Sequence, residues 1–241
     1  MAEEFQQSHN RRARVQGIQV GLAVSLYGIS FGALSVALGF SVWQTMVLSL
    51  LMFSGASQFA FIGIIGTGGV AAAAAAIASA GLLGIRNGLY ALRLSPIIGS
   101  GFWKRALAGQ LTVDESTAVA VAQSDQESAR HGFWMTAVVL YVGWNFATLV
   151  GALAGDALGD VRTWGLDAMA AAAFLGLLWP RLTSREPIAI AIAAAAVTVV
   201  LLPAVPAGIP VLAAAAVGIA LAVYRHRVDP HAPERTEGGS A

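Results

Sequence analysis

Charged residues are scarce in this chain of 241 residues, and cysteine is absent altogether. Only 11% of the residues are charged, whereas a soluble globular domain has about 25%, so the charges cannot cover a water-facing globule. The absence of cysteine excludes a disulfide framework and any site in which cysteine binds a metal or an iron–sulfur cluster. The formal net charge of +1 gives no reason to expect a nucleic-acid partner.

Sequence signatures of two common enzyme classes are also missing. The chain has neither the GxxxxGK[ST] pattern of a P-loop nor the HExxH pattern of a zinc protease. Its few histidines lie near the ends or in an expected loop, which disfavours a histidine-based metal site. We therefore expect no catalytic residue, no metal site and no cofactor, and we do not expect an enzyme.

Apolar stretches instead fill the chain from residue 17 to residue 224. A helix that spans a bilayer needs about 20 mainly apolar residues. The segments that fit are 17–39, 44–65, 70–85, 132–153, 164–179, 187–203 and 209–224, and the stretches 88–103 and 106–122 are shorter or interrupted. The sequence therefore predicts an all-α, polytopic membrane helix bundle.

The positions of the arginines predict the orientation, because Arg and Lys in short loops mark the cytoplasmic side. Arg11, Arg12 and Arg14 precede the first segment, and Arg225 and Arg227 follow the last, so we expect both termini in the cytoplasm. The second half fits four crossings, and the first half must then contain an even number. We therefore expect 88–103 to cross and 106–122 to be re-entrant or to lie at the surface, which gives seven or eight crossings.

Three regions follow from this reading. Residues 1–16 are polar and form a cytoplasmic tail, residues 17–224 form the membrane transport domain, and residues 225–241 form a second, disordered cytoplasmic tail. A cleaved signal peptide is not expected, because the first apolar stretch exceeds the 7–15 residues, roughly, of a signal-peptide core.

The second apolar segment contains a polar interruption, Phe53-Ser54-Gly55-Ala56-Ser57-Gln58-Phe59. Glycine and small polar residues at mid-membrane depth favour an unwound helix, whose freed backbone groups need partners from the protein or from a water-lined cavity. Such breaks hold substrates in transporters, so Gly55, Ser57 and Gln58 are candidate substrate-binding residues. The alternative is a close helix crossing in which Ser57 and Gln58 bond to a neighbouring helix.

Arg86 and Asn87 end the third apolar segment. An arginine at a helix end usually extends to the interface. It can instead turn inward and hold a carboxylate in a bidentate pair, and the neighbouring Asn87 favours an inward polar cluster. Both residues are candidates for substrate binding.

Asp114 and Glu115 form the remaining acidic pair of the first half. They are typical of a helix N-terminus, where acids interact favourably with the helix dipole. A partly desolvated carboxylate here would alternatively titrate near neutrality and carry a proton, or pair with Arg86. Charge at membrane depth is costly and usually functional, so both acids are candidates for proton coupling.

Several strings together resemble the AzlC family. They are FSGASQFAFIGII, GIRNGLYALRLSPII, LTVDESTAVA, YVGWNFATLVGALAGDALG and GLDAMAAAAFLGLLWPRL. The resemblance implies the large subunit of an exporter of leucine, isoleucine, valine and analogues, in some members methionine, which acts with a small membrane partner of the AzlD family. It carries a functional expectation to Gly55, Ser57, Gln58, Arg86, Asn87, Asp114 and Glu115.

The functional expectation is therefore a multi-pass exporter in the bacterial inner membrane. No nucleotide-binding pattern is present, so an ion gradient is the expected energy source. The alternative is a passive channel, or a structural subunit whose polar residues serve helix packing.

Overall fold

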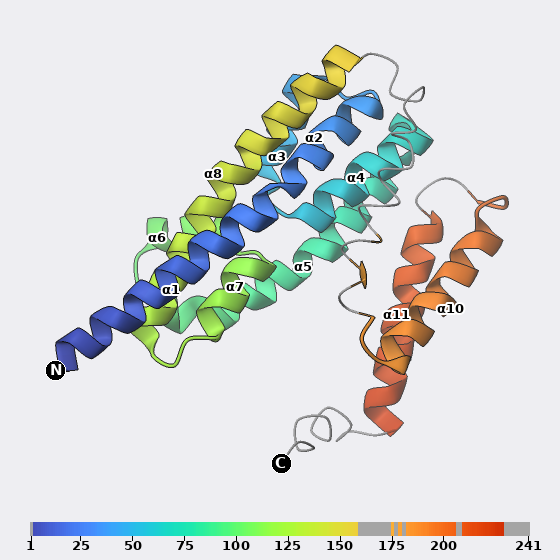
Figure 1. The fold of residues 1–241 in the computed structure, drawn as a ribbon. Coiled ribbons are helices and arrows are strands. Elements are labelled where there is room, and N and C mark those ends of the chain that lie inside the picture. The colour runs from blue at the N-terminus through green and yellow to red at the C-terminus, as the bar shows by residue number, and fades with distance from the viewer. Residues whose placement is uncertain (1, 159–174, 176–177, 180–181, 206–208, 229–241) are drawn as a thin grey trace.

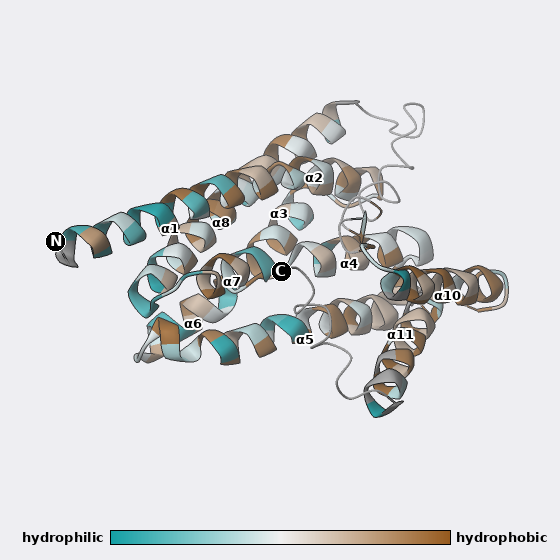
Figure 2. Ribbon diagram, turned by 60° about the horizontal axis from the view of Figure 1, so that its bottom comes forward, coloured by the Kyte–Doolittle hydropathy of each residue, from teal (hydrophilic) through white to brown (hydrophobic). Residues whose placement is uncertain are grey.

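The computed structural model describes residues 2–158, 175, 178–179, 182–205 and 209–228, and regular structure in these ranges is entirely helical (Figure 1). Three helices are long and apolar enough to cross a bilayer, and they span Glu4–Ala37, Val70–Ile98 and Gln126–Ala157. The predicted all-α membrane bundle is thus confirmed. Figure 2 shows hydrophilic residues on the first turns of α1 and in the middle of α5, within otherwise apolar helices.

One side of the bundle is formed by α1 (Ala2–Ser25), α2 (Tyr27–Ala37) and α8 (Gln126–Leu158). Helix α8 runs parallel to α1 and α2 and packs along both (Figure 1). Small residues allow the close approach. Gly17 lies against Thr136, and Gly32 lies against the backbone of Thr148. Gly17, Gly28 and Gly32 thus form the face on which α1 and α2 pack against α8.

Residues 28–32 also match the G-x-S-x-G pattern of hydrolase nucleophile elbows. They lie inside helix α2, whereas that motif requires a sharp turn between a strand and a helix. The match therefore has no catalytic meaning here.

Helices α3 (Val42–Leu51) and α4 (Gly55–Gly68) form a hairpin rather than one crossing. Ser41 caps α3, exchanging hydrogen bonds with Gln44. The chain breaks at residues 52–54, as the polar interruption predicts, but α4 then turns back. Its far end reaches the end of α2, because Gly66 packs against Leu38. The predicted crossing 44–65 is thus a hairpin with its tip inside the bundle.

Helix α5 (Ala73–Ile98), which follows the short 3-10 helix η1 (Val70–Ala72), runs antiparallel to α8. Its middle approaches the tip of the first hairpin, and the Ile97 carbonyl near its end accepts a hydrogen bond from Arg130 of α8 at 2.9 Å. The expected segments 70–85 and 88–103 are therefore one helix. Arg86 and Asn87 do not end it, because their side chains face an interior cavity that accommodates polar groups.

Helices α6 (Phe102–Leu111) and α7 (Asp114–Val121) form a second hairpin at the opposite end of the bundle. Arg105 of α6 binds Ser95 and the Gly99 carbonyl at the end of α5, and Val119 of α7 packs on Gly132 near the start of α8. The expected re-entrant stretch 106–122 is thus a hairpin that begins at residue 102.

The tips of the two hairpins meet. The Gln110 amide nitrogen, next to the second tip, donates to the carbonyl oxygens of Leu50 and Leu51 at the first, both at 3.1 Å. Two broken helices thus enter the bundle from opposite ends. The first half makes two full crossings, one by α1 with α2 and one by α5, so the expected even number is kept.

The last described helices, α10 (Arg185–Leu201) and α11 (Ile209–Val228), pack on each other, and α11 touches α5 (Figure 1). They correspond to the expected segments 187–203 and 209–224. The expected segment 164–179 lies almost wholly outside the described residues, as does the tail beyond residue 228.

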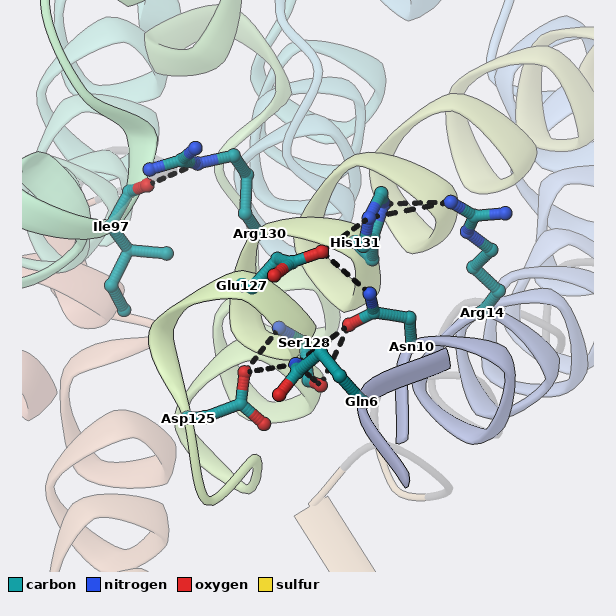
Figure 3. Close-up of polar contacts among 9 residues, drawn as sticks. All are labelled: Gln6, Asn10, Arg14, Ile97, Asp125, Glu127, Ser128, Arg130 and His131. Carbon is teal, nitrogen blue, oxygen red and sulfur yellow. Dashed lines mark hydrogen bonds and ion pairs between the residues drawn. The ribbon is translucent and has the colours of Figure 1, made fainter. Parts of the chain in front are cut away.

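The polar N-terminal residues belong to α1 and contact the start of α8 (Figure 3). Asn10 donates to Glu127 at 2.7 Å and accepts from Ser128 at 2.9 Å, while the Gln6 amide nitrogen donates to Asp125 at 2.9 Å. The charge of Asp125, Glu127, Arg130 and His131 suggests a solvated loop, but the last three lie in the first turns of α8. These contacts place the N-terminus and the turn before α8 at the same end.

We expect Gly32→Ala to destabilise the protein strongly, because the added Cβ would overlap the Thr148 carbonyl of α8. Gly63→Ala on α4 is the matched control, since its Cβ would meet nothing within 4 Å. Thermal unfolding in detergent measures the difference. Equal melting temperatures for the two variants would contradict the close packing of α2 on α8.

We expect Asp125→Ala to cost about 0.5–2 kcal/mol of stability, because Asp125 caps α8. The Ser128 backbone N–H donates to its carboxylate at 2.8 Å, and this bond lowers the pKa of Asp125. A lowered carboxyl pKa stabilises the fold above the ordinary value of about 3.9 and loses this effect as the pH falls below it.

The measurement is thermal unfolding at neutral pH and at successively lower pH, with Asp156→Ala, an exposed site near the end of α8, as control. The difference in melting temperature between wild type and Asp125→Ala should become smaller as the pH falls. A difference in melting temperature that grows as the pH falls would refute the capping role.

Candidate functional site

A cavity of about 270 Å³ lies where the two hairpin tips meet. The first tip contributes Phe53, Ser54 and Gly55, and the second contributes Val113, Asp114 and Glu115. Arg86 and Asn87 enter from α5, and Leu140 and Trp144 enter from α8. The volume is just below the range of about 300–1,000 Å³ that is usual for drug-sized ligands, so the cavity suits a small molecule.

The polar side of the cavity is built around an ion pair. A guanidinium nitrogen of Arg86 lies 3.0 Å from a carboxylate oxygen of Asp114, and the two side chains are 26% and 23% exposed. Arg86 thus turns inward in this structure, and Asp114 pairs with it from the first turn of α7.

Two buried polar atoms beside this pair have no hydrogen-bond partner among the described residues. They are the Nε atom of Arg86, a donor, and the Oδ1 atom of Asn87, an acceptor. Buried polar groups are normally satisfied, so such atoms at a cavity are suited to contact a ligand or water.

The N-termini of two half-helices also border the cavity, and they differ in charge. Helix α7 carries Asp114 and Glu115 in its first turn, which offset its positive end. Helix α4 has no acid in its first turn, and Ser54 gives it no side-chain cap. The N–H groups of Gly55 and Ala56 have no hydrogen-bond partner in the described part of the chain, so they offer an uncompensated site for an anionic group.

The remaining wall is apolar and aromatic. Phe53, Phe59 and Trp144 line it together with Val24 and Leu140. Phe31 lies behind them, with its ring centroid 5.6 Å from that of Phe59 and 6.3 Å from that of Trp144. The cavity is therefore amphipathic, with charges from α5 and the second hairpin tip and with hydrocarbon from α1, α8 and the first hairpin.

Gln58 does not line this cavity. It is fully buried, and its amide nitrogen donates to the Met52 carbonyl at 2.7 Å while its amide oxygen accepts from the indole nitrogen of Trp144 at 3.1 Å. These bonds satisfy a carbonyl freed by the break after α3 and tie the tip to α8. For Gln58, the structure thus favours the structural alternative.

Ser57 is also occupied in packing. Its hydroxyl donates to the Ala80 carbonyl of α5 at 2.9 Å, and Ser54 lies 3.1 Å from it. Ser57 borders a separate cavity of about 370 Å³ that shares Ser54 and Asn87 with the first. Of the candidate residues, Gly55, Arg86, Asn87, Asp114 and Glu115 therefore converge on one cavity, while Ser57 and Gln58 support it.

Sequence reasoning missed Ser54, Leu140 and Trp144 as lining residues. Trp144 stands next to Asn145 in an apolar helix, and that polar neighbour was the only available signal. Asn145 itself donates to the Tyr141 carbonyl of the same helix at 2.8 Å.

This arrangement defines an α-helical integral membrane protein in which broken helices meet around an interior polar site, as in secondary transporters. The chain belongs to the AzlC family: the family model described as AzlC protein matches residues 19–158, the region that holds both hairpins and all but one of the residues that line the cavity.

The chain is also 31% identical over 179 residues to a protein of Archaeoglobus fulgidus described as an uncharacterized membrane protein. That match covers 73% of this chain and 77% of the archaeal protein. No solved structure matches the chain.

We expect Gln58→Leu to lower the stability by about 1–3 kcal/mol, because it leaves the buried Trp144 indole N–H without its acceptor and leaves the Met52 carbonyl with the Ser54 N–H alone. Gln19→Leu, at an exposed position of α1, is the control. Melting temperature and membrane abundance report the loss. A variant as stable as the control would show that the amide does not hold the tip.

Proposed function

We propose that this chain is the membrane subunit of an exporter of branched-chain amino acids, driven by an ion gradient and acting with a small AzlD-like subunit. Its location would be the bacterial inner membrane, with both termini in the cytoplasm. The observation that carries the proposal is the amphipathic cavity at the meeting of the hairpin tips, with the Arg86–Asp114 pair at its polar end. Membership of the AzlC family supports the substrate class.

The cavity has a complement for each part of an aliphatic amino acid. The substrate carboxylate would bind the N-terminus of α4 at Gly55 and the Arg86 guanidinium. The ammonium group would approach Asn87 Oδ1 and Glu115, which line the same cavity. The hydrocarbon side chain would extend towards Leu140 and Trp144.

The ion pair offers a physical route to proton coupling. A substrate carboxylate that binds Arg86 competes with Asp114 for the guanidinium, and the freed Asp114 carboxylate would instead bind the substrate ammonium group. An Asp114 that carries a proton has no charge for that contact, so the substrate and the proton would exclude one another at this site, as an exchange of the two requires.

Counterflow of labelled leucine in proteoliposomes tests the function. The chain is reconstituted with and without its small partner, and with and without a pH gradient. Uphill movement driven by the gradient supports a carrier, whereas downhill leakage alone would indicate a channel. Absence of leucine exchange under every condition would overturn the proposal.

We expect Asp114→Asn to abolish efflux driven by a pH gradient and to retain leucine exchange, because an amide keeps the shape of the side chain but carries no proton. Asp156→Asn, the same change at an exposed position of α8, should leave both activities intact. Leucine efflux from vesicles with an imposed pH gradient measures the driven activity, and leucine exchange without a gradient measures the other. Uphill efflux by Asp114→Asn at the wild-type rate would exclude Asp114 as the carrier.

A further inference from the structure

The apolar end of the cavity has an unusually well-fixed wall. The indole of Trp144, only 5% exposed, borders the cavity beside Gly55 of the first hairpin tip. Its nitrogen donates to Gln58 at 3.1 Å, and its ring is stacked on Phe31 with an interplanar angle of 27°. The ring is thus held both at its polar atom and on one face.

The first hairpin fixes the same ring from another direction. Gly55 lies so close that a Cβ built on it would be 3.3 Å from the Cη2 atom of Trp144. Gln58, whose amide is anchored to the Met52 carbonyl at 2.7 Å, is fully buried and has no room to follow a displaced indole. A ligand side chain therefore meets a wall that cannot move aside at low cost.

The geometry points to Trp144 as the residue that sets the size of the accepted side chain, with Gln58 as the residue that positions it. This inference rests on the proposed function. With the polar head of the substrate held at Gly55 and Arg86, the rigid indole beside Gly55 would limit the width of the side chain that fits next to that head to those of leucine and isoleucine, and an aromatic amino acid would collide with it. The site would thus exclude phenylalanine by shape.

The test is competition of phenylalanine with labelled leucine, in the preparation that exchanges leucine. Wild type should favour leucine. Trp144→Phe should lower the leucine-to-phenylalanine preference by at least about tenfold, since one methylene of fit already changes discrimination by about 10- to 200-fold. Phe146→Leu, two residues along α8 on its exposed surface, should keep the wild-type preference.

Two further variants separate selectivity from folding. Leu140→Ala enlarges the same end of the cavity without touching the Gln58 bond, and it should also admit phenylalanine. Trp144→Phe combined with Gln58→Leu removes both partners of the buried bond, which is less costly than removing one. Gln58→Leu alone should reduce the preference, and it should add nothing in the Trp144→Phe background, because it acts through the indole.

The outcomes distinguish the two proposals. If the wild-type protein exchanges no amino acid, the proposed function fails. If it exchanges leucine but excludes phenylalanine no better than the Trp144→Phe and Leu140→Ala variants do, the function stands and the role of Trp144 is wrong.

Discussion

Two helices break in the middle of this apolar bundle, and each break leaves backbone groups without their helical hydrogen bonds. The structure depends on other groups that satisfy them. At bilayer depth no bulk water can pair with the carbonyls at the end of α3, and each unpaired group would cost several kcal/mol by general estimates. Side chains supply the missing donors: Gln58 binds Met52, Gln110 binds Leu50 and Leu51, and Tyr141 of α8 also donates to Leu50 at 3.1 Å. Without these bonds the tips could not meet, and the cavity would not exist.

The same donors have a functional consequence. They occupy the carbonyls at the C-terminal end of α3, so the polarity left at the cavity comes from the N-termini of α4 and α7 and from the charges nearby. Because Asp114 and Glu115 offset only the α7 end, the two halves of the site differ in sign. A zwitterionic ligand, which carries both charges and has no net charge, fits such a site better than a simple ion does.

Much of the site was predictable from residue type. The polar interruption at residues 53–59 indicated a break, and the inward pairing of Arg86 with Asp114 was among the alternatives that the residues allowed. The division of α5 at Arg86 was wrong because hydropathy treats a polar residue as the end of an apolar run, although one helix face can be polar where it meets a cavity. For Gln58 the residue type left two roles open, because a buried amide binds freed backbone as readily as it binds a ligand, and its bonds to Met52 and Trp144 favour the structural one.

The sequence alone determined that this is a membrane bundle of helices, because so few charges and such long apolar runs allow no other compact state. It also indicated the break at residues 52–54. Only the tertiary structure decided that residues 42–68 turn back rather than cross, since a break leaves the direction of the next helix open until other helices pack on it. Tertiary contacts alone also placed Trp144 and Leu140 at the site, because wall residues are chosen by proximity and not by residue type.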